Sequence, residues 1–159
     1  YMFANMGAFA VVTIFEDHTG SSQIDSYSGL AKSSPFVAIS MTIFLLSLAG
    51  IPPLAGFMAK YYVFAAAIKI AGTDAAYNWM YWLVGVGLLT TVFALYYYAN
   101  IIKTMYFYPD ASPYRLKLPL PAAIVLAVGL AGVVVFGLMP EPILKLASYI
   151  ALPFGYMTP

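Results

Sequence analysis

An apolar stretch from residue 35 to residue 71 constrains the fold of this chain more than any other feature. As one straight helix it would extend about 55 Å, whereas the hydrocarbon core of a bilayer is about 30 Å thick. The stretch must therefore break or reverse, and the segment 50 to 56 predicts where. Prolines there remove backbone donors and clash with the preceding turn, and glycines permit unusual backbone angles. These breaking residues are Gly50, Pro52, Pro53 and Gly56. We predict two half-helices, at about 35 to 49 and 57 to 71.

The composition is that of a membrane protein. Only 8% of the residues are charged and 63% are hydrophobic, whereas about 25% of a soluble domain is charged. Apolar units predict an all-α, polytopic membrane helical bundle of about four transmembrane units, the second one broken. The units cover residues 1 to 15, 35 to 71, 79 to 107 and 119 to 139. A broken helix survives at membrane depth only where protein or a water-filled cavity satisfies its backbone, so we expect the second unit to lie in the interior.

Three further features predict how the chain enters and leaves the membrane. The unit that opens at Tyr1 is shorter than the ~20 residues of a spanning helix, so we expect an earlier part of that helix to precede it. Ser34 and Pro35 predict an N-cap and a first helical residue. Before Pro35, large apolar residues recur at every third position, which indicates a short amphipathic turn at the interface or a plain loop. These residues are Ile24, Tyr27 and Leu30.

The basic residues predict an orientation in the membrane. With four crossings, segments 16 to 34 and 108 to 118 share one side, and segment 72 to 78 shares the other with the C-terminus. Four basic residues fall on or near the first side and two on the second, which favours a cytoplasmic first side. They are Lys32, Lys103, Arg115 and Lys117 against Lys69 and Lys145.

Several function classes are excluded by composition. A net charge of +1 without a Lys/Arg cluster excludes nucleic-acid binding. Because the chain has no cysteine, it can form no disulfide, thiolate metal site or cysteine-ligated iron-sulfur cluster. His18, the single histidine, is expected to be a solvated loop residue and not a metal ligand. We therefore expect no metal and no cofactor site in this chain.

Lys60 is the candidate functional residue, because it is the only charged residue between Pro35 and Ile68. A lysine near the centre of a membrane helix costs roughly 3 kcal/mol on insertion scales, so it is rare unless it has a task. We expect it in the first turn of the second half-helix, as an ion or proton site. Lysine suits proton exchange because, unlike arginine, it can lose its proton when buried. The alternative is a purely structural lysine, whose side chain either reaches out to the membrane surface or forms an ion pair with a carboxylate.

Asn5 is a second candidate, because it is the only amide in its apolar run. An unpaired amide in hydrocarbon is costly. It could bond water or the carbonyls that the break frees, and so belong to a polar path. The alternative is a bond to a neighbouring helix with no transport role.

One long motif indicates a family. The run LSLAGIPPLAGFMAKYYVF, with the later tyrosines of ALYYYANIIKTMYF, resembles the C-terminal part of the antiporter-like N subunits (mitochondrial subunit 2) of respiratory complex I, the proton-pumping NADH:quinone oxidoreductase. The resemblance implies a fourteen-helix subunit of two inverted five-helix repeats, with our units as helices eleven to fourteen. The family's helix-twelve lysine then falls on Lys60, which would belong to a chain of protonatable residues along the membrane axis.

The resemblance implies the following function. The chain would take part in proton translocation coupled to quinone reduction, with no redox centre of its own. NADH, FMN, iron-sulfur clusters and quinone would lie in partner subunits. Its partners would be the other membrane subunits, the lipid bilayer and protons. Its location would be a bacterial inner membrane or an organellar membrane.

Two alternatives stay open. Subunits of multisubunit sodium/proton antiporters share the broken helix, and the carbonyls of the segment 50 to 56 could supply oxygen ligands for sodium. A purely structural membrane bundle would merely tolerate Lys60. The tyrosines after Lys60 and the triple tyrosine at 96 to 98 favour subunit N over its relatives L and M.

Overall fold

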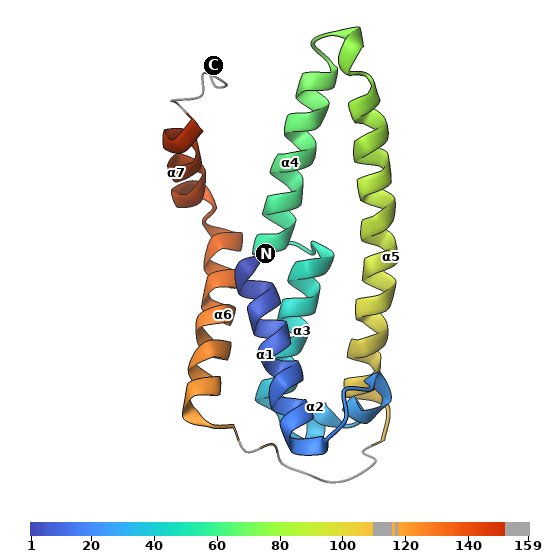
Figure 1. The fold of residues 1–159 in the computed structure, drawn as a ribbon, viewed down its shortest axis with the longest axis vertical. Helices are drawn as coiled ribbons and strands as arrows, with labels where there is room; N and C mark the ends of the chain where they lie inside the picture. Colours follow the sequence, from blue (N-terminus) through green and yellow to red (C-terminus); the bar gives the residue numbers. More distant parts are fainter. Residues whose placement is uncertain (110–115, 117, 152–159) are drawn as a thin grey trace.

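The computed structural model describes residues 1–109, 116 and 118–151, and among these residues it is helical with no strand (Figure 1). The prediction of an all-α chain is confirmed. The longer helices are α1 Met2–Thr19, α3 Pro35–Ala49, α4 Ala55–Ala71, α5 Trp79–Phe107, α6 Leu120–Leu138 and α7 Glu141–Ala151. Shorter turns are η1 Ile24–Tyr27, α2 Leu30–Ser33 and η2 Ala75–Tyr77.

The helices α1, α3 and α6 pack together, and α5 runs beside α3 and α4 (Figure 1). The helix α4 continues beyond the end of α3 on the far side of the break, and it also contacts α6. The turns η1 and α2 lie at one end of the bundle, and the connection between α4 and α5 lies at the other. The break between α3 and α4 therefore lies at mid-height, between α5 and α6.

The core lies between α1, α3 and α6. Phe44 of α3 is fully buried, and its ring fits against two glycines. A Cβ atom at Gly7 of α1 would run into this ring, and one at Gly129 of α6 would lie 3.1 Å from it. Small residues let membrane helices approach closely, so the glycines allow three helices to close around one aromatic side chain.

The side chains of α4 and α5 are largely exposed. Only Gly56 and Ala71 of α4 are buried, and on α5 large apolar side chains such as Trp82 and Tyr96 are each 80% exposed. Within the part of the chain that the structure describes, two helices are long and apolar enough to cross a membrane, Ala75–Phe107 and Leu120–Leu138, while Pro35–Ala49 is apolar but shorter. Exposed apolar helices of this kind suit contact with lipid or with further helices.

The structure corrects several details of the sequence-based predictions. The non-helical segment covers residues 50 to 54, because α4 begins at Ala55, so Lys60 lies in the second turn of α4 and not in the first. His18 lies in the last turn of α1, exposed, and not in a loop. A further helix, α7, begins at Glu141, beyond residue 139, at which our last predicted unit ended. Proline at the second position of a helix interrupts nothing, because the N–H it lacks has no intrahelical partner there.

The start of α3 also differs in one contact. Pro35 is the first residue of α3, as predicted, but the side chain of Ser34 makes no capping bond. Its hydroxyl accepts a hydrogen bond from the backbone N–H of Leu116 at 3.0 Å instead. Nearby, Tyr27 stacks on Phe15 with ring centroids 3.9 Å apart, and Leu30 is fully buried. The segment before α3 is thus a short helical turn whose apolar side chains pack into the core, which agrees with an amphipathic turn and not with a plain loop.

Candidate functional site

The end of α3 is the first part of the site. Gly50 adopts a left-handed conformation (φ 86°), which glycine tolerates without the steric cost of a side chain. Its N–H donates to the carbonyls of Leu46 and Ser47, and the N–H of Ile51 donates to Leu46 as well. The chain then turns through Pro52 and Pro53, which are joined by a cis peptide bond. Two of the last four carbonyls of α3 are thus satisfied by backbone donors.

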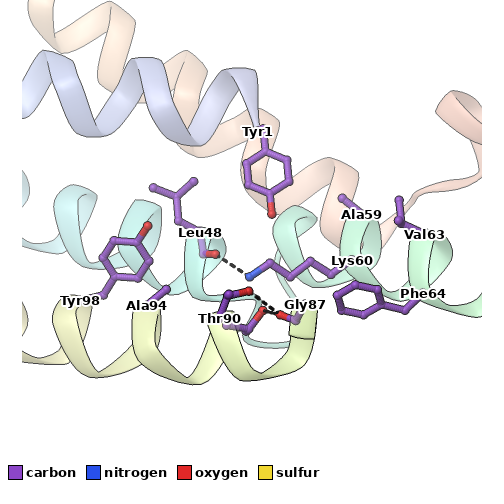
Figure 2. A pocket seen from close by; sticks show the side chains of 11 residues that line it. Tyr1, Leu48, Ala59, Lys60, Val63, Phe64, Gly87, Thr90, Ala94 and Tyr98 are labelled. Carbon is purple, nitrogen blue, oxygen red and sulfur yellow. Dashed lines mark hydrogen bonds between the residues drawn. The ribbon is translucent and has the colours of Figure 1, made fainter. Parts of the chain in front are cut away.

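Lys60 satisfies the other two. Its Nζ atom donates to the carbonyl of Leu48 at 3.0 Å and to that of Ala49 at 3.2 Å (Figure 2). The C-terminal carbonyls of a helix carry partial negative charge, and lysines often bind them. The side chain of Lys60 is half-buried. Lys60 therefore spans the break and binds the open end of α3 from α4.

The start of α4 lies against the same turn of α3. The N–H of Gly56 donates to the hydroxyl of Ser47 at 3.1 Å. A Cβ atom at Gly56 would run into the carbonyl oxygen of Ser47, so the two backbones touch here. On the other side, a Cβ atom at Gly137 of α6 would run into the carbonyl oxygen of Pro53. The backbone on either side of the break therefore touches α3 and α6, while Pro52 and Pro53 themselves are exposed in this structure.

Two cavities meet at Lys60. One has a volume of about 580 Å³ and lies between α1, α3, α4 and α5; its polar side chains besides Lys60 are Tyr1, Thr90, Thr91 and Tyr98. The other, of about 360 Å³, lies between α4 and α5. Figure 2 shows the Lys60 side chain reaching back towards Leu48, with Thr90, Ala94 and Tyr98 on the neighbouring helix. No carboxylate lines either cavity among the described residues.

This arrangement places hydroxyl groups beside the cavity that Lys60 lines. The hydroxyls of Thr90 and Thr91 both donate to the carbonyl of Gly87 at 2.9 Å, which leaves their oxygen atoms free to accept. A lysine bordered by cavities with hydroxyl groups can exchange a proton with water, because ammonium donates and a neutral amine accepts. Within the described residues no group of three or more His, Cys, Asp or Glu side chains could hold a metal ion.

Asn5 does not join this site in the structure. Its side chain is exposed on α1 and makes no hydrogen bond with the described residues. The carbonyls that it was expected to bind, those freed at the break, are taken by Lys60. The residues Gly50, Pro52, Pro53 and Gly56 all lie at or beside the break.

Ser47 is the residue that sequence reasoning missed. Its hydroxyl carries no signal in the sequence, because Ser40 and Thr42 of the same helix look alike and bond only carbonyls of their own helix. The spacing of nine residues between Ser47 and Gly56 becomes meaningful only when the loop at 50 to 54 places the start of α4 beside the last turn of α3.

The fold and the site together define a class: a multi-pass helical membrane protein in which a lysine binds the open end of an interrupted helix. The sequence profile of the family described as NADH:quinone oxidoreductase/Mrp antiporter, TM, matches residues 1–94. The chain belongs to this family.

The relatives carry the names of membrane subunits. The chain is 41% identical to F(420)H(2) dehydrogenase subunit N of Methanosarcina mazei over 96% of its length, and 40% identical to NADH-quinone oxidoreductase subunit N of Moorella thermoacetica over 97%. These matches confirm the predicted resemblance to subunit N. The chain spans 31% of the length of each of these two relatives.

A solved structure agrees in fold. Respiratory complex I from Thermus thermophilus with bound aureothin contains a chain that superposes with a TM-score of 0.59 at 28% sequence identity. The match covers 77% of the present chain and 26% of that one. The helix arrangement seen here therefore occurs within an assembled respiratory complex.

Proposed function

We propose that this chain forms part of a proton-translocating membrane subunit of an NADH:quinone oxidoreductase of the complex I type, and that Lys60 exchanges the proton. The observation that carries the proposal is the position of the Lys60 ammonium on the carbonyls of Leu48 and Ala49, next to two cavities. The names of the relatives support the assembly. Redox chemistry, with NADH, FMN, iron-sulfur clusters and quinone, belongs to partner subunits.

The proposed setting draws on the names of the relatives and on the exposed apolar helices. The chain crosses a bacterial inner membrane or an organellar membrane about four times, with α3 and α4 as one interrupted unit. The other membrane subunits of the complex cover the exposed faces of α4 and α5. The electron donor is left open by the relatives, because one is named for F(420)H(2) and another for NADH.

Sodium/proton antiport is the second candidate, because the family description includes Mrp antiporters. A sodium ion at the break would need several oxygen ligands. Two carbonyls there already accept from Lys60, so sodium would have to displace a positive charge before it could bind. This geometry favours the proton. A purely structural role, the third candidate, gives no reason for hydroxyl-bearing cavities beside the lysine.

The test is proton pumping by the native complex in reconstituted membranes with Lys60→Met and Lys60→Ala. We expect some loss of assembled complex, because two carbonyls of α3 lose their donor. Pumping and the coupled NADH:quinone activity per assembled complex should fall together and much further. Electron entry to an artificial acceptor upstream should persist. Pumping at the wild-type rate and stoichiometry by Lys60→Met would show that the lysine is structural. Transport that stops when sodium is removed would favour the antiporter.

A further inference from the structure

Ser47 occupies an unusual position for a serine in a helix. It lies in the last turn of α3, is 1% exposed, and its hydroxyl accepts the N–H of Gly56 at 3.1 Å from beyond the break. The first N–H groups of a helix have no partner within the helix and need an acceptor elsewhere. The residue at the N-cap of α4 is Leu54, whose side chain cannot accept. Ser47 therefore caps α4 from the preceding helix.

The contact between Ser47 and Gly56 determines where Lys60 can reach. Lys60 follows Gly56 by four residues, about one turn, so both face the same side of α4. The carbonyls that Lys60 binds belong to Leu48 and Ala49, the two residues after Ser47. One crossing point therefore sets the position of the ammonium on the end of α3.

The close approach of α3 and α4 at Ser47 and Gly56 fixes the position of the Lys60 ammonium. Any Cβ at Gly56 would run into the carbonyl of Ser47, and the Lys60 stem lies along Gly50, where a Cβ would stand 3.0 Å from its Cδ atom. The position of the ammonium thus depends on the hydrogen bond at Ser47 and on the close contacts at Gly50 and Gly56. A loss of the Ser47 bond would let α4 shift along α3 and move the ammonium off its carbonyls.

We propose that Ser47 is a positioning residue for the proton transfer of Lys60, holding α4 in the register that places the ammonium on the carbonyls of Leu48 and Ala49. The inference rests on the proposed function. It assigns to Ser47 no contact with the proton itself. The titratable groups that line the cavities beside Lys60 among the described residues are tyrosines: Tyr1, Tyr61 and Tyr98.

The experiment compares two buried serines of the same helix in the native complex. Ser47→Ala removes the acceptor for Gly56, whereas Ser40→Ala removes a hydroxyl that is equally buried but bonds only Phe36 of its own helix. Proton transport per assembled complex is measured across a range of pH. We expect Ser47→Ala to lower transport about fivefold, the change that one lost hydrogen bond typically produces. Its pH profile should be displaced, and Ser40→Ala should match the wild type in both.

Each other outcome decides against a part of the account. A Ser47→Ala profile equal to that of Ser40→Ala overturns the inference, and so does a loss of transport in proportion to lost complex with an unchanged profile. If Ser47→Ala does not assemble, Ser47→Cys keeps the size with a weaker acceptor, and its profile is read instead; failure of both to assemble assigns Ser47 a structural role only. Lys60→Met that transports normally overturns the proposed function. If Lys60→Met does not transport protons while Ser47→Ala transports them as the wild type does, the inference is overturned and the proposed function stands.

Discussion

The Nζ atom of Lys60 lies 3.0 Å from the carbonyl oxygen of Leu48, twelve positions earlier in the chain and on the opposite side of a helix break. With its second bond, to Ala49, it completes the hydrogen bonding of the last four carbonyls of α3. The charge and the break therefore stabilise each other. An ammonium that is partly removed from water needs acceptors, and a helix end needs donors for its last carbonyls.

The crossing of α3 and α4 predicts a strong effect of a single methyl group. Gly56→Ala would place a Cβ against the carbonyl of Ser47, and overpacking of this kind costs about 1–3 kcal/mol. We expect less assembled complex and a lower melting temperature. Gly85→Ala is the matched control, since a Cβ there meets nothing within 4 Å. Equal stability of the two variants would contradict the close approach.

Substitution of Gly50, the left-handed glycine at the end of α3, should affect proton transport beyond its effect on stability. Gly50→Ala and Gly20→Ala both place a side chain at positive φ, with values of 86° and 69°, which costs about 1 kcal/mol in each case. Only at Gly50 does the new Cβ stand 3.0 Å from Lys60; at Gly20 it meets nothing within 4 Å. We expect similar losses of thermal stability, measured by unfolding, and a loss of proton transport for Gly50→Ala alone. A loss of transport in both variants would show that stability, not the position of Lys60, limits the rate.

The exposed amide on α1 predicts a silent substitution. Asn5 makes no side-chain hydrogen bond with the described residues and does not line the cavities at Lys60. Asn5→Leu should therefore pump protons at the wild-type rate in the native complex. A pumping rate reduced several-fold with intact assembly would place Asn5 in the path after all.

The aromatic centre of the core predicts the largest loss of stability. Phe44→Ala empties the space between Gly7 and Gly129, and such truncations cost about 3–5 kcal/mol. Phe93→Ala, at a side chain that is 74% exposed, should cost far less in detergent. Thermal unfolding of both variants measures the difference. Comparable melting temperatures would mean that Phe44 is not a core residue.

The sequence could predict those features of the fold that residues close together in the chain determine. The break after Ala49 follows from the excess length of the apolar stretch and from Pro52 and Pro53, so it could be predicted. The position of Lys60 shortly after the break could be predicted for the same reason. The helix α7 was not predicted, because a proline such as Pro142 is common both after the end of a helix and in the first turn of a new one.

The partners of Lys60 and Ser47 could not be predicted, because they depend on how the loop at 50 to 54 places α4 against α3. Every residue offers a carbonyl, and nothing in the sequence marks those of Leu48 and Ala49. Likewise Ser34 has the pattern of an N-cap, but its hydroxyl bonds the distant backbone of Leu116. A tertiary contact there overrides the local preference.

The central claim, that Lys60 exchanges a proton and does not merely supply charge, is tested most directly by Lys60→Arg beside Lys60→Met. A guanidinium can still donate to the carbonyls of Leu48 and Ala49, but it stays charged and cannot cycle. Proton pumping per turnover is measured in reconstituted membranes that contain the native complex. We predict that Lys60→Arg assembles as well as the wild type yet pumps as poorly as Lys60→Met. Wild-type pumping by Lys60→Arg would show that the positive charge alone suffices, and would contradict the account.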